Sequence, residues 1–238
     1  MSELDDLLSV QDHDSAIDRL RARRVKLPER QELAARQEEA EALEAQRAEL
    51  QTQRDAAARD ERHLDENVNA LERRIAEVEQ ELYSGKNNIP RELQALQADI
   101  EQLKRQRSSM EDQELDAMER REGLDGEVAQ LEEKVAAVTA DIDRLTGVIS
   151  EQEAAIDAEL ATETTERGSA AAKVSAELLK TYETIRAGND GIGAARLVGG
   201  MCQGCHLALP AVEVDRIKKL PPGESIRCDQ CGAILVRS

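Results

Sequence analysis

The sequence predicts a mainly α-helical protein: a long antiparallel coiled-coil helical hairpin, followed by a small C-terminal module of short β-strands. Three observations lead to this fold class. Apolar residues recur every seven positions over two long stretches, a short segment containing glycine and asparagine separates the stretches, and the last 47 residues alternate short apolar runs with glycine, proline and cysteine. The composition agrees, because 34% of the 238 residues are charged while Trp and Phe are absent, as is typical of long helices.

The first long helix is predicted over about residues 29–83. Two series of period seven interleave there with spacings of three and four, which is the seam of a coiled coil. One series comprises Leu43, Leu50, Ala57, Leu64, Leu71 and Val78, and the other comprises Val68, Ile75 and Leu82. Pro28 separates this helix from an N-terminal helical segment, residues 1–27.

The second long helix is predicted to begin at Pro90 and to carry a longer seam. Its two series are Leu93, Ile100, Arg107, Glu114, Arg121, Val128, Val135, Ile142, Ile149 and Ile156, and Leu96, Leu103, Met110, Ala117, Leu124, Leu131, Val138 and Leu145. Because this seam outruns the first, we expect residues 1–27 to cover the excess. The whole hairpin domain is assigned to residues 1–188.

The tip of the hairpin is predicted near residues 84–90. Gly85 suits the left-handed position that ends a helix, Asn87 and Asn88 suit a tight loop, and Pro90 suits a first helical turn. A loop this short folds the second helix back against the first.

The middle of the seam is polar. We expect Ala57 opposite Ala117, with long side chains crossing past these alanines to form Arg–Glu pairs. The polar positions are Arg47, Arg54 and Glu61 on one helix and Arg107, Glu114 and Arg121 on the other. Such a layer either fixes the register at a cost in stability or provides a partner site or hinge.

Weaker helical signals follow. Threonines and Gly168 predict a bend within residues 161–172, after which a helix resumes and ends with Gly188 as its C-cap. His13 and His63 fall in helices and are expected to be solvated.

Two Cys-x-x-Cys pairs, 22 residues apart, dominate residues 192–238 and predict a tetrathiolate metal site made by Cys202, Cys205, Cys228 and Cys231. Zn²⁺ accepts four thiolates in tetrahedral geometry, and this segment is too small to fold without such support. A covalent haem at Cys202–His206 would leave the second pair without a role, and a redox pair would need a βαβ frame. An iron site with the same ligands remains an alternative. We therefore assign residues 192–238 to a C4 zinc ribbon with one structural Zn²⁺.

These motifs together resemble a bacterial family of C4-type zinc-ribbon, coiled-coil proteins long catalogued as a domain of unknown function. The resemblance rests on "LYSGKNNIPRELQALQ", "LLKTYETIR", "CQGCHLALP" and "IRCDQCGAILVR". It implies a long helical hairpin with a C-terminal ribbon and the same four cysteine ligands. It also implies partners such as transcription and flagellar regulators, among them an alternative sigma factor, and RNA binding in some members.

Charge separates the candidate functions. The net charge is −18, whereas residues 192–238 hold six Lys or Arg against four Asp or Glu and so carry +2. An acidic hairpin opposes general binding to nucleic acid, but the ribbon offers basic contact residues: Arg196, Lys218, Lys219, Arg227 and Arg237.

The prediction is a non-enzymatic adaptor or regulatory protein that binds a protein partner through the arm and the ribbon, with the transcription machinery as a candidate partner. The alternative is an RNA- or DNA-binding protein that uses the ribbon's basic residues. An acidic N-terminus and the lack of an apolar run of bilayer length predict a cytoplasmic protein without a membrane partner. No constellation for a small-molecule substrate is present, and self-association of the hairpin stays open.

Overall fold

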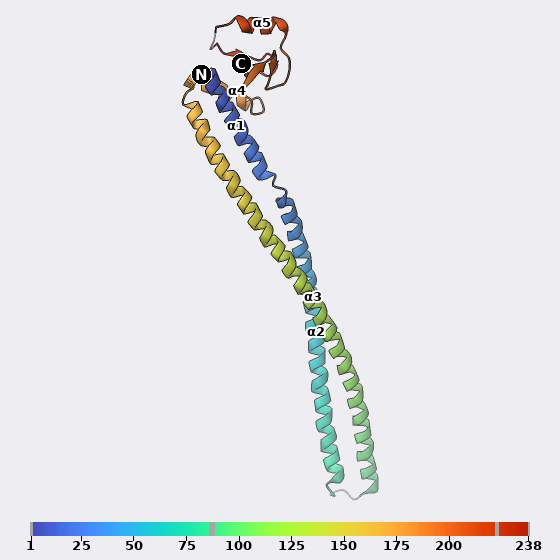
Figure 1. Ribbon diagram of the computed structural model, residues 1–238. Helices are drawn as coiled ribbons and strands as arrows, with labels where there is room; N and C mark the ends of the chain where they lie inside the picture. The colour runs from blue at the N-terminus through green and yellow to red at the C-terminus, as the bar shows by residue number, and fades with distance from the viewer. Residues whose placement is uncertain (1, 86–88, 222–223, 238) are drawn as a thin grey trace. The chain divides into compact units, whose positions relative to one another are not determined.

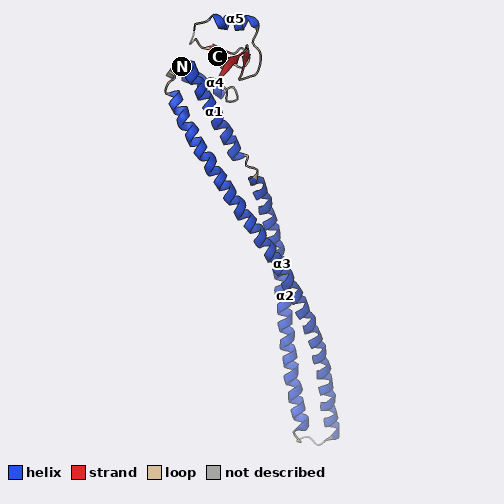
Figure 2. Ribbon diagram, viewed as in Figure 1, coloured by secondary structure: helices blue, strands red, loops and turns tan. Residues whose placement is uncertain are grey.

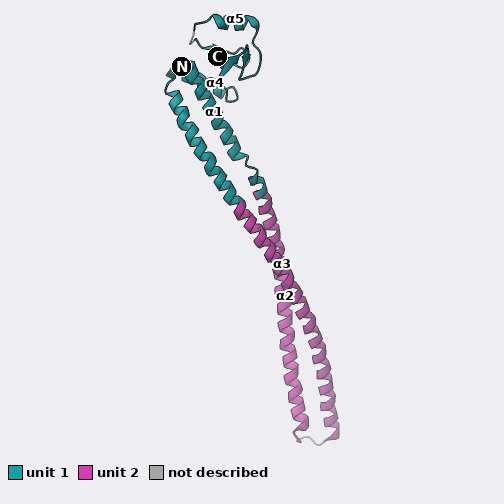
Figure 3. Cartoon of the chain, in the orientation of Figure 1, with its two compact units in different colours: residues 1–32, 145–238 teal, residues 33–144 magenta. Residues whose placement is uncertain are grey.

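The computed structural model describes residues 2–85, 89–221 and 224–237, and the chain divides into two compact units (Figures 1 and 3). Unit 1 comprises residues 1–32 and 145–238, and unit 2 comprises residues 33–144. The fold class is confirmed: long helices dominate and a few short strands lie in the C-terminal segment (Figure 2). The predicted domain limits, 1–188 and 192–238, were set by sequence motifs, whereas the two units are defined by compactness, so these limits stay a prediction.

Unit 2 is an antiparallel helical hairpin made of α2 (Glu29–Tyr83) and α3 (Pro90–Ala171), less the ends of these helices that belong to unit 1. Ion pairs between the helices prove the direction, because Glu79 bonds Lys104 while Glu61 bonds Arg121. Every predicted seam position in the two helices is buried or half-buried, as the period of seven requires. Gly85 has a positive φ of 71°, as predicted, whereas Asn87 and Asn88 lie outside the described residues.

The polar layer forms as predicted in one respect. Glu61 Oε2 lies 2.6 Å from Arg121 Nε, and Ala57 and Ala117 are both buried. Arg54 instead faces Asp125, at 3.8 Å between Nε and Oδ1. Cross-helix ion pairs past small residues therefore fill the centre of the hairpin.

The bend expected within residues 161–172 lies later than predicted: α3 continues without a break to Ala171, and the chain turns at residues 172–174. Thr162 and Thr165 return their hydroxyl groups to the carbonyl oxygens of Ala158 and Ala161, so they satisfy their polar groups without leaving the helix. The chain turns directly afterwards, and α4 (Ala176–Ala187) follows with Gly188 as its C-cap, as predicted.

Unit 1 begins with α1 (Glu3–Val25), which lies along the last part of α3 and so covers the longer seam, as expected. Arg24 Nε bonds Asp157 at 2.9 Å, and the buried Asp14 accepts from Arg167 Nε at 3.2 Å. Tyr182 of α4 donates to the same carboxylate at 2.8 Å. Asp14 thus joins three helices through charge-assisted hydrogen bonds.

A four-stranded sheet completes unit 1, in the order β2-β1-β4-β3. Strands β1 (Ala194–Val198) and β4 (Ile234–Arg237) are parallel neighbours at its centre. The edge strands β2 (Met201–Cys202) and β3 (Ile226–Arg227) pair antiparallel with β1 and β4. A short helix that the sequence analysis did not predict, α5 (Ala211–Lys219), connects β2 to β3.

The two faces of the sheet pack against different partners. Side chains of Ile234 and Val236 join Leu7 and Tyr182 in one apolar cluster, which comes from α1 and α4. Leu235, between them in β4, belongs instead to a second cluster with α5 and the cysteines. The alternation of a β-strand thus places the helical base on one face and the cysteines on the other.

Gln11 of α1 fixes the chain where α4 leads into β1. Its Oε1 accepts from the backbone amides of Gly193 and Ala194 at 2.6 and 3.1 Å, and its Nε2 donates to the carbonyl oxygen of Gly191 at 3.0 Å. Gly193 is packed so closely on Tyr182 that an added Cβ would lie 2.5 Å from its ring. The glycine-containing stretch at 191–193 is therefore held by Gln11 and by Tyr182.

Candidate metal centre and ribbon surface

The four cysteine thiols converge at one point of unit 1. Their sulfur atoms all lie within 4.8 Å of one another, and the distances Cys202–Cys231 and Cys205–Cys228 are both 3.9 Å between Sγ atoms. A tetrahedron with Zn–S bonds of about 2.3 Å has edges of about 3.8 Å. The thiols therefore fit a ZnS₄ centre, and the cofactor is one structural Zn²⁺.

Both cysteine pairs lie on turns of the same construction. In the first turn the amide of Cys202 donates to Leu207, five residues on, while the amide of His206 donates back to the Cys202 carbonyl. In the second turn Cys228 donates to Ala233 and Gly232 donates back to Cys228. Two short strands, β2 and β3, lead into these turns and position the sulfur atoms.

His206 and Gly232 occupy equivalent positions in the two turns, and both have left-handed backbone conformations, with φ of 58° and 74°. His206 is exposed and is not among the groups of possible metal ligands that the described residues form. The position requires a left-handed backbone conformation, which costs histidine more than it would cost glycine. Alignment of "CQGCH" with "CDQCG" is the signal that could have shown this.

The thiols differ in electrostatic environment before metal binds. Burial raises the pKa of Cys202 and raises the pKa of Cys231 to about 12, whereas the backbone amide of Leu207 lowers the pKa of Cys205. Zinc must displace the protons of the raised thiols, so its binding releases protons. Four thiolates complete the tetrahedral shell and leave no open position for a reactive water molecule.

The five predicted basic contact residues have different surroundings. Arg237 is committed inside the ribbon, because its guanidinium donates to the carbonyl oxygens of Ile217, Leu220 and Pro221 at 2.9, 2.8 and 2.6 Å. Arg196 faces Asp12 of α1 at 3.3 Å. The three others are exposed: Lys218, Lys219 and Arg227.

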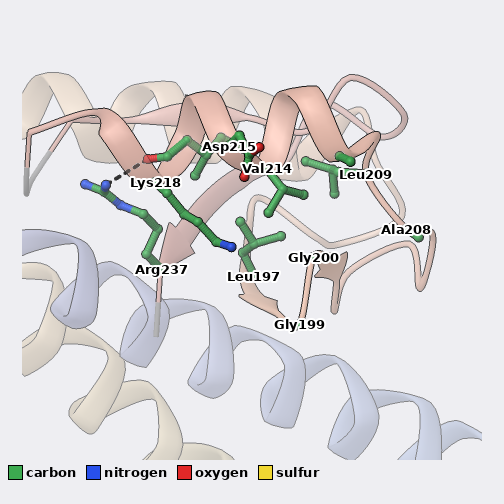
Figure 4. Close-up of a pocket in the computed structure, with 11 residues that line it drawn as sticks. Leu197, Gly199, Gly200, Ala208, Leu209, Val214, Asp215, Lys218 and Arg237 are labelled. Carbon is green, nitrogen blue, oxygen red and sulfur yellow. Dashed lines mark hydrogen bonds between the residues drawn. The ribbon is translucent and has the colours of Figure 1, made fainter.

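A cavity of about 620 Å³ lies between α5 and the sheet (Figure 4). Val214 and Ile217 of α5 and Leu197 of β1 provide its apolar walls, and Lys218 extends from α5 toward Leu197. Gly200 lets the loop after β1 lie close to α5, since a Cβ added at Gly200 would lie 3.3 Å from the Val214 side chain. The cavity opens on the surface of the ribbon, on the α5 side of the sheet.

Large apolar side chains are exposed at several positions of the ribbon, and the sequence analysis did not single them out. Their exposed fractions are 49% for Val198, 40% for Met201, 50% for Leu207 and 83% for Val212. We call these four residues the ribbon patch. Exposed large apolar side chains are typical of an interaction surface when they gather on one face. Val198 and Met201 do so, because they pair with each other across β1 and β2.

Among the helices in the described part of the chain, none is both long and apolar enough to cross a membrane.

The comparisons with known proteins agree with the fold. Residues 10–190 match the family model of the CT398-like coiled coil hairpin domain, and residues 201–235 match that of the C4-type zinc ribbon domain.

Similar proteins come from bacteria. Uncharacterized proteins from two strains of Mycobacterium tuberculosis are each 29% identical over 97% of this chain and 94% of their own length. A solved structure from Mycobacterium smegmatis aligns with a TM-score of 0.68 at 26% identity over the whole of both chains. The structure of CT398 from Chlamydia trachomatis aligns with a TM-score of 0.67 at 20% identity over 99% of this chain and 98% of its own, which shows a common fold.

Proposed function

The chain belongs to the CT398-like coiled coil hairpin family, and we propose that it is a non-enzymatic cytoplasmic adaptor that binds a protein partner through its hairpin arm and its zinc ribbon. The observation that carries this proposal is that the ribbon exposes apolar surface, both in the ribbon patch and in the cavity under α5. Zinc then has a structural task, which is to hold the surface that the partner contacts.

The chemistry of the patch suggests what kind of segment docks there. Apolar side chains surround a cavity whose rim carries Lys218, and Lys219 follows on the same helix. A partner segment with an apolar anchor next to an acidic residue would fill the cavity and pair with a lysine. Buried anchors of this type carry most of the binding energy in protein interfaces.

The test compares partners captured by the full-length protein and by single variants. Val212→Asp and Leu207→Asp place a charge in the ribbon patch, and Val25→Asp is the matched control, because Val25 is 73% exposed but lies at the end of α1. We expect the wild-type protein and Val25→Asp to bind the captured partner with equal affinity. Both patch variants should bind it at least about tenfold more weakly, a loss of about 1.4 kcal/mol in binding free energy.

Two further arms define failure. The captures are made with and without nuclease, so that partners tethered by nucleic acid are removed. If Cys228→Ser, which breaks the metal site, captured the same partners with the same affinity, the ribbon would not be the docking head. Equal binding by all three aspartate variants would overturn the assignment of the patch.

Nucleic-acid binding is the second candidate, and the exposure of Lys218, Lys219 and Arg227 favours it. Three phosphate contacts predict a logarithmic salt slope of about −3, and the acidic hairpin would oppose them. A mobility-shift assay with RNA and DNA probes at physiological salt decides. Loss of a shift in Lys218→Ala/Lys219→Ala, but not in the control Arg216→Ala, whose guanidinium is paired with Glu213, would place this function ahead of the adaptor.

A further inference from the structure

A second group of metal-ligating side chains lies in unit 1, on helices that the zinc site does not use. His13 projects from α1, and Glu163 and Glu166 project from successive turns of α3. The expectation that His13 is solvated is wrong: its side chain is only 21% exposed, and its Nδ1 lies 2.7 Å from Glu163 Oε2. We propose that these three residues form a second metal site, which takes a divalent first-row transition metal ion.

The size of the cluster fits a coordination shell. Nδ1 of His13 is 2.7 Å from Glu163 Oε2 and 3.8 Å from Glu166 Oε2, and all three ligand atoms lie within 4.8 Å of one another. With metal–N and metal–O bonds of about 2.0–2.2 Å, neighbouring ligands in a tetrahedron or octahedron are separated by about 2.8–3.6 Å. Small rotations of two side chains bring the three atoms to these distances.

The charge of the cluster also calls for a cation. Among the ion pairs of the described residues, Glu163 and Glu166 each contact His13 and no lysine or arginine. The adjacent Arg167 does not serve them, since it is committed to Asp14 and Glu183. Two carboxylates thus converge on one half-buried imidazole, and a divalent ion would neutralise them.

The neighbouring residues hold the cluster in place. Asp14 follows His13 on α1, Arg167 follows Glu166 on α3, and these neighbours bond each other at 3.2 and 3.4 Å. Asp14 is also held by the hydroxyl group of Tyr182. The two helices are therefore clamped one residue away from the ligands, and little entropy remains to be lost when metal binds.

The ligand set defines the class of metal. One imidazole and two carboxylates suit Mn²⁺, Fe²⁺, Co²⁺, Ni²⁺ or Zn²⁺, whereas Mg²⁺ and Ca²⁺ prefer oxygen ligands alone. Three protein ligands leave positions for water. A bound ion would link α1 to α3. Helix α1 also holds the ribbon sheet through Gln11.

The test uses full-length, zinc-loaded protein and Mn²⁺ as the probe. Mn²⁺ is the weakest of these ions for a given site, so it does not displace zinc from four thiolates. The loss of the free Mn²⁺ signal in electron paramagnetic resonance gives stoichiometry and affinity. We expect one saturable Mn²⁺ site per chain, in addition to the zinc.

Single variants locate the site. Glu163→Gln and His13→Gln should weaken Mn²⁺ binding at least about tenfold, since each removes a direct ligand. The matched control is Glu159→Gln, an exposed carboxylate one turn earlier on α3, which should bind as the wild type does. Circular dichroism and zinc content check that each variant is folded.

The competing explanation is that the hydrogen bond between His13 and Glu163 completes the cluster without an ion. It predicts that Mn²⁺ shows no saturable binding to the zinc-loaded protein. That result, or equal loss of affinity in Glu159→Gln and Glu163→Gln, would overturn the proposal.

Discussion

Gln11→Leu should destabilise unit 1 more than any exposed glutamine substitution, because it removes the acceptor of two buried amides. Leucine has nearly the volume of glutamine, so packing changes little and the loss is one of hydrogen bonds. The amides of Gly193 and Ala194 would stay buried without a partner, at about 1–3 kcal/mol each. The two amides alone give a total of about 2–6 kcal/mol, and the Gly191 carbonyl also loses its donor. This is a large part of the about 5–15 kcal/mol that stabilises a folded unit.

The chain supplies its own reporter for this measurement. It contains no Trp and two Tyr: Tyr83 lies at the end of α2 and is 81% exposed, and Tyr182 is fully buried in unit 1. In a Tyr83→Phe background, tyrosine fluorescence therefore follows Tyr182 and unit 1 alone. Urea titrations are run with zinc bound. With a slope of about 2 kcal/mol per molar urea, the midpoint should fall by about 1–3 M in Gln11→Leu.

Gln31→Leu is the control, since Gln31 is an exposed residue of the same unit. Its midpoint should remain close to that of the background. If Gln11→Leu shifted the midpoint no further than this control, water would be replacing the glutamine at both amides, and the reasoning that Gln11 holds the sheet to α1 would be wrong.

Four other outcomes are expected. His206→Gly should slow zinc release to a chromogenic chelator and His206→Val should speed it, because the left-handed backbone costs about 1–2 kcal/mol for a residue with a Cβ. Gly123→Ala and Gly126→Ala should each raise the stability of the hairpin by about 1 kcal/mol in thermal melts, since an added Cβ meets nothing within 4 Å. Removing zinc with a thiol reagent and chelator should release one ion per chain and expose the amides of β3, β4 and α5 to hydrogen exchange, with little loss of total helix signal. Burial and the hydrogen bond to Asp14 hold the pKa of Tyr182 far above its usual range. The contribution of Tyr182 to stability is therefore fully present below about pH 10 and falls as pH rises further, by up to about 1.4 kcal/mol per pH unit. Urea titrations of the Tyr83→Phe protein at a series of pH values measure this fall.

The hairpin could be predicted closely because its signals are local. Pro28 and Pro90 mark helix boundaries by their missing amide donors, and the heptad period marks the buried face of α2 and α3 directly. The bend expected within residues 161–172 comes only at the end of that range, for a physical reason. Threonine and glycine weaken a helix only slightly, and packing of α3 against α1 outweighs that preference.

The zinc ligands were predictable from spacing, whereas the surface that they support was not. Helix α5 is nine residues long, too short for a periodic signal, and it follows Pro210 among residues that read as a loop. The residues that form the ribbon patch are set by which face of the sheet each β2 side chain lies on, and by which side of α5 packs against the sheet. That choice is made by contacts of Leu209 and Ile217 with the cysteines and Leu235, which are distant in sequence.

The partner of the other sheet face was hidden for the same reason. Periodicity in residues 1–27 shows that α1 has an apolar face, but it does not show that Leu7 meets β4 as well as α3 and α4. In β4, Ile234 and Val236 point to α1 while Leu235 points to the zinc turns, and all three are at most 3% exposed. One strand is therefore buried by a helix on one face and by a metal-dependent fold on the other. Detaching α1 would uncover one face of β4, and removing zinc would uncover the other. Because both supports bury the same strand, each stabilises the other, although α1 and the cysteines belong to different apolar clusters.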